Sequence, residues 1–119
     1  MIISFDFDDT LCQEMPTGFD GHANLGMPTV EILKEYYSLG CTCIILTARV
    51  NSQGNINEIT SFLKNFDIYH MVDKICFTDH DLKGYHARRL GVSLHYDDCD
   101  VQIESLRSFG ITCIDSKGI

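Results

Sequence analysis

Carboxylates dominate the stretches of this sequence whose residue types and spacing are suited to chemistry. Asp6 and Asp8 stand one residue apart directly after an apolar run, and the pair Asp97 and Asp98 follows a second apolar run. Two acidic clusters brought together repel each other unless a cation lies between them. Oxygen donors without Cys or His are the ligands that Mg²⁺ favours, together with water and phosphate oxygens. These four aspartates therefore predict a magnesium site.

The spacing of Asp6 and Asp8 indicates two carboxylates with separate roles. One can attack phosphorus while the other supplies a proton and later recovers it. Attack by a carboxylate requires that the negative charge of the phosphate be neutralised, and Mg²⁺, the Lys83 ammonium and the Thr47 hydroxyl are the available groups. Arg49 carries a forked guanidinium that suits phosphate oxygens, with a surface ion pair as the alternative.

Short apolar runs alternate with helical periodicity along the chain. Strands are expected at residues 2–7, 41–47, 74–78, 92–96 and 111–114. Helices are expected at residues 28–39, 55–66, 82–90 and 101–109, where Pro28 opens the first helix and an Asn55–Glu58 capping pattern opens the second. Five strands alternating with four helices predict an α/β fold: a doubly wound, Rossmann-like parallel five-stranded sheet with helices on both faces.

Such a sheet explains how distant polar residues meet, because the carboxyl ends of its strands face one shared crevice. Asp6, Thr47 and Asp97 each stand at the end of a predicted strand. Lys83 begins the helix after the third strand, whereas Lys74 precedes that strand and competes for the same role. The position of Lys83 on the carboxyl side favours it over Lys74.

Taken in order, these motifs resemble those of the haloacid dehalogenase superfamily of aspartate-nucleophile phosphatases. They span residues 1 to about 100 and read Asp6-Phe7-Asp8-Asp9-Thr10, Ile44-Ile45-Leu46-Thr47, Lys83, and Asp97-Asp98 after Leu94-His95-Tyr96. The resemblance implies a Mg²⁺-dependent phosphomonoester hydrolase in which Asp6 becomes a phosphoaspartate and Asp8 is the general acid and base. It further implies the remaining roles: Thr47 and Lys83 bind the phosphoryl group, and the metal ligands are Asp6, Asp8 (through its backbone carbonyl) and Asp97, with Asp98 in support.

No stretch of the sequence is long enough for a cap domain of this superfamily, so the resemblance implies a capless, open site. A narrower resemblance is to the phosphatase domain of phage polynucleotide kinase, carried by Thr47-Ala48-Arg49 and by Tyr96-Asp97-Asp98. The partner implied is a phosphorylated substrate: a small metabolite, a nucleotide or a polynucleotide end. An open site also allows a homo-oligomer in which a neighbouring subunit supplies the lid. The irregular stretch at residues 10–27, which contains His22, is long enough to predict a functional flap.

Composition limits the other possibilities. The 119 residues carry 9 basic and 17 acidic side chains, a net charge of −8, which disfavours broad contact with nucleic acid or membrane surfaces. No apolar run is long enough to span a membrane, and Asp6 interrupts the N-terminal run too early for a signal peptide. The six cysteines lie mostly in apolar runs and form no CxxC pair, which predicts reduced thiols and a cytoplasmic protein. The length predicts a single domain over residues 1–119.

Two other functions compete with the phosphatase interpretation. A receiver-type signalling domain has a similar size and sheet, and would use Asp79 as phosphoacceptor and Lys117 as its lysine. The Asp97-Asp98 pair has no role in that scheme. A catalytically silent binding domain on the same fold is the third alternative, although both carboxylates of the first motif are present.

Overall fold

A computed structural model describes residues 1–13 and 25–119 of the chain. Its centre is a parallel sheet in the order β5-β4-β1-β6-β7. The strands are β1 (Ile2–Phe5), β4 (Thr42–Thr47), β5 (Val72–Phe77), β6 (Val92–Asp97) and β7 (Thr112–Asp115). The described helices are α1 (Thr29–Ser38), α2 (Gln53–Asn65), α3 (Lys83–Leu90) and α4 (Asp100–Ser108). The predicted doubly wound, five-stranded α/β fold is confirmed.

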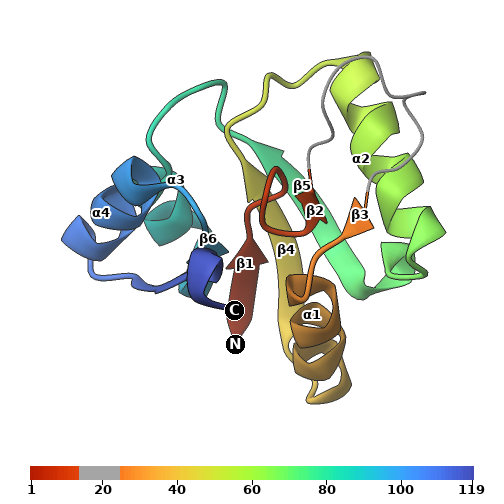
Figure 1. Ribbon diagram of the computed structural model, residues 1–119. Coiled ribbons are helices and arrows are strands. Elements are labelled where there is room, and N and C mark those ends of the chain that lie inside the picture. Colours follow the sequence, from red (N-terminus) through yellow and green to blue (C-terminus); the bar gives the residue numbers. More distant parts are fainter. Residues whose placement is uncertain (14–24) are drawn as a thin grey trace.

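Helices cover both faces of the sheet, with α1 and α2 on one side and α3 and α4 on the other (Figure 1). Strand β4 shows how the sequence produces this arrangement, since its side chains alternate between the two faces. Cys43 and Ile45 belong to the core beneath α1 and α2, whereas Ile44 and Leu46 belong to the core beneath α3 and α4. Apolar residues on both faces are what a buried parallel strand requires.

The central strand β1 lies between β4 and β6, so the order of the sheet reverses beside it. The chain builds β4 and β5 on one side of β1, and then crosses to build β6 and β7 on the other. Crevices at such a reversal are where open α/β sheets bind ligands. The register pairs Phe5 with Tyr96, and the Asp6 amide donates to the Tyr96 carbonyl at 2.9 Å. The ends of β1 and β6 are therefore adjacent, as the predicted site requires.

The start of α2 differs from its prediction. The N-cap is Ser52, whose hydroxyl accepts a hydrogen bond from the Asn55 amide at 3.2 Å, so the helix begins at Gln53. The Asn55 side chain instead accepts from Arg49 Nη1, and Glu58 forms an ion pair with the same guanidinium. The predicted capping box at Asn55 and Glu58 is wrong because both side chains are engaged by Arg49 and Ser52 stands at the better position.

The segment between β1 and α1 carries two short strands that the sequence pattern did not predict. These are β2 (Cys12–Gln13) and β3 (Leu25–Gly26), which pair antiparallel. Most of the predicted flap at residues 10–27, including His22, lies outside the described residues. Between β4 and β5 the structure has α2 and the short 3₁₀ helix η1 (Tyr69–Met71), and the described residues contain no cap. Across residues 1–13 and 25–119, none of the helices has the length and apolar character to cross a bilayer.

Candidate active site

A buried lysine joins the ends of the two adjacent strands. Lys83 Nζ lies 2.8 Å from Asp6 Oδ1 and 2.7 Å from Asp97 Oδ2, and all three side chains are almost fully buried. The second oxygen of Asp97 accepts a hydrogen bond from the Cys99 amide at 3.1 Å. Ionic groups this deeply buried persist only when they are paired and hydrogen-bonded. The structure thus brings together Asp6, Lys83 and Asp97, three of the residues selected from the sequence.

Lys83 owes its position to close packing between α3 and α4. The N-cap of α3, Leu82, has no side-chain acceptor for the free amides of the first turn. Side chains of α4 accept from these amides instead, since Gln102 Oε1 lies 2.8 Å from the Lys83 amide and Ser105 Oγ lies 3.1 Å from the Gly84 amide. A Cβ at Gly84 would lie 2.5 Å from the Ser105 carbonyl oxygen, so this close approach requires glycine.

A third carboxylate, Asp98, completes an acid cluster. Ligand oxygens of Asp6, Asp97 and Asp98 all lie within 4.8 Å of one another. The Thr10 hydroxyl stands between two of these residues, 3.2 Å from Asp6 Oδ2 and 3.4 Å from Asp98 Oδ1. It also contacts the Ser116 hydroxyl at 3.2 Å, which ties the 3₁₀ helix η2 (Ser116–Gly118) to the site.

The donor set of this cluster fits a hard divalent cation. All candidate ligands are carboxylate oxygens, as Mg²⁺ prefers. Three carboxylates face the single ammonium of Lys83, and a divalent cation would offset this excess of acidic groups. The cluster of Asp6, Asp97 and Asp98 can therefore hold a metal ion.

The two carboxylates that contact Lys83 have opposite pKa shifts. Burial raises the pKa of Asp6 well above its usual value, and the lysine charge opposes that rise only in part. Burial also pushes the pKa of Asp97 upward, but the hydrogen bond from His95 and the charge of Lys83 outweigh burial and hold the pKa at about 2. For Lys83, burial favours the neutral amine, but Asp6 and Asp97 outweigh it and raise the pKa. Asp97 therefore keeps its negative charge more easily than Asp6 does.

Asp8 and Arg49 were predicted to act on the substrate, but in this structure they bind each other. Arg49 Nε donates to Asp8 Oδ2 at 2.9 Å and Arg49 Nη2 donates to Asp8 Oδ1 at 2.7 Å. The guanidinium also contacts Glu58 and Asn55 and lies 5.2 Å from the centre of the Phe7 ring. Arg49 thus forms the ion pair that was the alternative prediction, and the Asp8 carboxylate points toward Arg49 rather than into the acid cluster.

The structure also shows where the other predicted site residues lie. Thr47 is buried at the end of β4, where its hydroxyl accepts from the Arg49 amide at 3.3 Å. Lys74 is exposed on β5, which leaves Lys83 as the lysine that contacts the acid cluster. For the receiver alternative, Asp79 is exposed in a turn with φ of 51°.

The other receiver residue, Lys117, is engaged elsewhere. Its ammonium donates to the Asp98 carbonyl at 2.7 Å and to Asp100 at 2.8 Å, and pairs with Asp115 at 3.1 Å. Within the described residues, the lysine that contacts buried carboxylates is Lys83. Lys117 therefore contacts Asp98, Asp100 and Asp115, and not Asp79 as a receiver site would require.

Sequence reasoning missed three polar residues of this site. Thr10 belongs to the first motif and His95 precedes the last one, but neither was predicted to take part in the site. Ser4 had no predicted role either, although Ser4 and Asp6, like His95 and Asp97, stand two residues apart and so share one face of a strand. That period of two was the signal available for finding Ser4 and His95.

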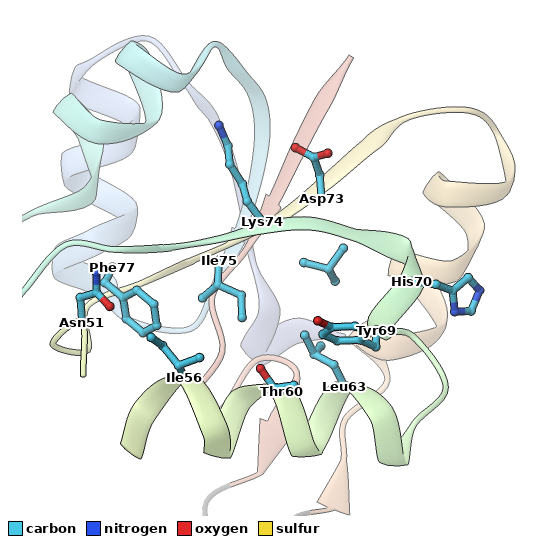
Figure 2. Close-up of a pocket in the computed structure, with 11 residues that line it drawn as sticks. Asn51, Ile56, Thr60, Leu63, Tyr69, His70, Asp73, Lys74, Ile75 and Phe77 are labelled. Carbon is cyan, nitrogen blue, oxygen red and sulfur yellow. The ribbon is translucent and has the colours of Figure 1, made fainter. Parts of the chain in front are cut away.

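A groove of about 630 Å³ lies apart from the acid cluster, between α2 and the edge strand β5 (Figure 2). Ile56, Thr60 and Leu63 line it from the helix, and Lys74 and Ile75 from the strand. None of the acid-cluster residues lines this groove. Convergent charged groups identify the acid cluster, and not this groove, as the candidate active site.

No known family model and no curated protein matches the sequence. Solved structures do share its fold, among them two of the Pnkp1/Rnl/Hen1 complex, one of which is described as an RNA repair complex. These two matches have TM-scores of 0.69 and 0.70 at 20% identity and cover 94% of this chain. They cover only 40% and 44% of the matched chains, so this chain spans less than half the length of those proteins.

A third similar structure is the core domain of a protein described as a phosphoglycolate phosphatase, from Streptococcus pneumoniae TIGR4. The TM-score is 0.57 at 18% identity, and the match covers 94% of this chain and 76% of that one. At these identities the three structures show a common fold and no more. The class that fold and site define together is a Rossmann-like α/β protein with an acid cluster at the carboxyl edge of its sheet.

Proposed function

We propose that this chain is a Mg²⁺-dependent phosphomonoester hydrolase of the haloacid dehalogenase type. The observation that carries the proposal is the position of Lys83, held between Asp6 and Asp97 where β1 and β6 end side by side. The fold shared with the core domain of a protein described as a phosphoglycolate phosphatase supports it. A buried lysine and a carboxylate at the reversal point of an open α/β sheet are suited to binding and attacking a phosphoryl group.

In the proposed reaction Asp6 is the nucleophile. A carboxylate oxygen of Asp6 forms a bond to phosphorus as the bond from phosphorus to the leaving oxygen breaks, and Asp8, which enters the reaction as the protonated acid, gives that oxygen its proton. Asp8 then takes a proton from water, whose oxygen attacks phosphorus and displaces Asp6. The product is inorganic phosphate, and both carboxylates return to their starting states.

The charges around Asp6 would support this chemistry. In this scheme Lys83 and the Thr47 hydroxyl would bind the phosphoryl oxygens. Asp6 and Asp97 would hold Mg²⁺ together with the Asp8 carbonyl, and Asp98 would support them. When bound, the ion neutralises charge on the phosphate and on the acids. Lys83 favours the ionised, nucleophilic form of Asp6, but burial still leaves the pKa of that carboxyl well above its usual value.

The ion pair between Asp8 and Arg49 has a function in this scheme. Two parallel hydrogen bonds fix the plane of the Asp8 carboxylate, which leaves little rotational freedom. To reach the leaving oxygen, Asp8 must exchange one of these bonds for a bond to the substrate. The role of Arg49 proposed here is therefore to orient Asp8, with phosphate contact as a second role once Asp8 turns away.

The proposed substrate is a nucleotide or the terminal phosphate of a nucleic acid. Two observations support this narrower proposal: the fold shared with a chain from an RNA repair complex, and the absence of a cap over the site in the described residues. A capless site accepts a phosphate at the end of a large molecule. The net charge of −8 predicts that contact is confined to that terminus.

The test is phosphate release with Mg²⁺ from a panel of 3′-phosphorylated oligonucleotides, nucleotides, sugar phosphates and phosphopeptides. We expect turnover that EDTA abolishes and that Asp6→Asn reduces to background. Preference for oligonucleotides would support the nucleic-acid substrate, and a shallow salt dependence would show that few phosphates beyond the terminal one are contacted. Turnover that survives Asp6→Asn would refute the proposed mechanism, and the absence of turnover alongside Mg²⁺ binding would favour a silent binding domain.

We also propose that the protein works in the cytoplasm. All six cysteines are free in the structure, and three of them, Cys12, Cys43 and Cys113, are buried. Burial raises the pKa of Cys43 and Cys113 to about 11, which keeps these thiols protonated and unreactive. Reduced thiols of this kind are typical of a reducing compartment.

A further inference from the structure

A buried histidine with no part in the proposed reaction lies directly behind the acid cluster. His95 on β6 and Ser4 on β1 are fully buried and are register partners in the sheet, and their side chains form a hydrogen bond through His95 Nδ1. On the other side of the ring, His95 Nε2 lies 2.8 Å from Asp97 Oδ2. The contacts form a continuous chain from Ser4 through His95 to Asp97.

The chemistry of the partners fixes the direction of both hydrogen bonds. An ionised carboxylate only accepts, so Nε2 carries the hydrogen that is donated to Asp97. In the neutral imidazole whose Nε2 carries that hydrogen, Nδ1 is an acceptor. The Ser4 hydroxyl donates to it. Ser4 thus stabilises the one tautomer of His95 that can donate to Asp97.

Ser4 and His95 lie on a buried face of the sheet, a position usually filled by apolar residues. Ser4 lies on the opposite face from its neighbours Ile3 and Phe5, on the side that packs against α3 and α4. An imidazole and a hydroxyl in such a place lose hydration, at a cost that hydrogen bonds only offset. Within the described residues, no buried side-chain nitrogen or oxygen lacks a partner. Two aliphatic side chains in place of Ser4 and His95 would fill this buried face of the parallel sheet without the loss of polar hydration.

We propose that His95 is a positioning residue for the metal site, and that Ser4 acts through it. By donating to one oxygen of Asp97, His95 holds the carboxylate in the orientation that places a ligand oxygen within 4.8 Å of those of Asp6 and Asp98. Groups that hydrogen-bond to metal ligands set the orientation of those ligands and the metal affinity, typically by about 10- to 100-fold. This inference rests on the proposed function, since it names how that same site is prepared for its cation.

The test is direct binding of Mn²⁺, used as a paramagnetic substitute for Mg²⁺, without substrate. Free Mn²⁺ is measured by electron paramagnetic resonance during titration of the wild-type protein, His95→Leu, His95→Gln and Ser4→Ala. We expect His95→Leu to raise the dissociation constant about 10- to 100-fold. His95→Gln, which keeps an N–H donor near the Nε2 position, should restore most of the affinity, and Ser4→Ala should fall between.

His86→Leu is the matched control, because His86 also contacts an aspartate, Asp81 at 3.5 Å, on the surface and away from the cluster. It should bind Mn²⁺ like the wild-type protein. Far-ultraviolet circular dichroism verifies the fold of each variant, and Ser4→Ala decides the question if His95→Leu does not fold. Equal affinity of the wild-type protein and the folded variants would refute the positioning role alone, and would show that Lys83 and the Cys99 amide suffice to hold Asp97. A wild-type protein that binds no Mn²⁺ would instead refute the metal site of the proposed function.

Discussion

Arg49 holds Asp8 by two parallel hydrogen bonds, 2.9 Å from Nε to Oδ2 and 2.7 Å from Nη2 to Oδ1. The two residues are 41 positions apart in the chain and follow neighbouring strands, β1 and β4. The guanidinium lies on the Phe7 ring and is held from the helix side by Asn55 and Glu58. The orientation of the Asp8 carboxylate therefore depends on Arg49.

This pair predicts that Arg49→Lys is not a conservative change. An ammonium cannot make two parallel hydrogen bonds to a carboxylate, so Asp8 loses its fixed plane. We expect kcat/KM for an aryl phosphate to fall at least about 10-fold in Arg49→Lys and further in Arg49→Ala, because small misplacements of a catalytic group cost up to about 100-fold. Arg88→Ala, at an exposed position, is the control and should be unaffected. Wild-type kinetics in Arg49→Lys would contradict the orienting role.

Removing the buried lysine should destabilise the fold. Lys83→Met leaves Asp6 and Asp97 without their shared cation, and the loss of one partner from a buried ionic group costs about 3–5 kcal/mol. Urea unfolding with EDTA measures this loss, and Mg²⁺ should restore more of it in the variant than it adds to the wild-type protein. The exposed pair Lys34–Glu31 provides the control, since Lys34→Met should cost less than about 1 kcal/mol. An unchanged free energy of unfolding in Lys83→Met would argue against a charged, paired Lys83.

Stability should depend on pH through His95. Because burial lowers the pKa of His95 below its usual value of 6.5, the unfolded chain binds a proton there that the folded protein does not. The contribution of neutral His95 to the free energy of unfolding is therefore complete above about pH 6.5. It is lost as the pH falls below that value, by up to about 1.4 kcal/mol per pH unit. Urea midpoints at about pH 7.5 and 5.5 in EDTA, on either side of that value, should differ more for the wild-type protein than for His95→Gln. If the urea midpoints of the two proteins changed by the same amount between these pH values, the pKa of His95 would be the same in the folded and unfolded states.

Much of this arrangement follows from the sequence, for reasons that particular residues make clear. Strand β4 was predictable because Cys43, Ile44, Ile45 and Leu46 form an apolar run too short for a helix. The proximity of Asp6 and Asp97 was predictable because the carboxyl ends of parallel strands lie at the same edge of the sheet. Lys83 was preferred over Lys74 on the same reasoning, and the structure places Lys83 at the acids.

Other features depend on contacts that no local pattern encodes. Ser4 and His95 are 91 positions apart and meet through strand register, which a single sequence does not specify. The strands β2 and β3 have two residues each, too few to show a period of two. The choice between phosphate contact and ion pair for Arg49 depended on where α2 brings Glu58, and that position is a matter of tertiary packing.

Close packing of α3 on α4 predicts a contrast between two glycines. A Cβ at Gly84 would lie 2.5 Å from the Ser105 carbonyl oxygen and from the Phe109 ring, so Gly84→Ala must push α3, and Lys83 with it, away from α4. We expect a loss of about 1–3 kcal/mol in the free energy of unfolding and reduced turnover. Gly54→Ala in α2 meets nothing within 4 Å and should stabilise the protein by about 0.5–1 kcal/mol. If both substitutions stabilised the protein, the packing of α3 would be looser than the structure shows.

The central claim is that Asp6 becomes covalently phosphorylated during turnover, and acid quenching of the reaction tests it most directly. The protein is mixed with a ³²P-labelled phosphomonoester and Mg²⁺, stopped within milliseconds, and digested for peptide mapping. The account predicts a transient label on the N-terminal peptide that contains Asp6, lost in Asp6→Asn and longer-lived in Asp8→Asn, where dephosphorylation lacks its base. Label on the peptide containing Asp79, or steady turnover with no labelled protein at any time, would contradict it.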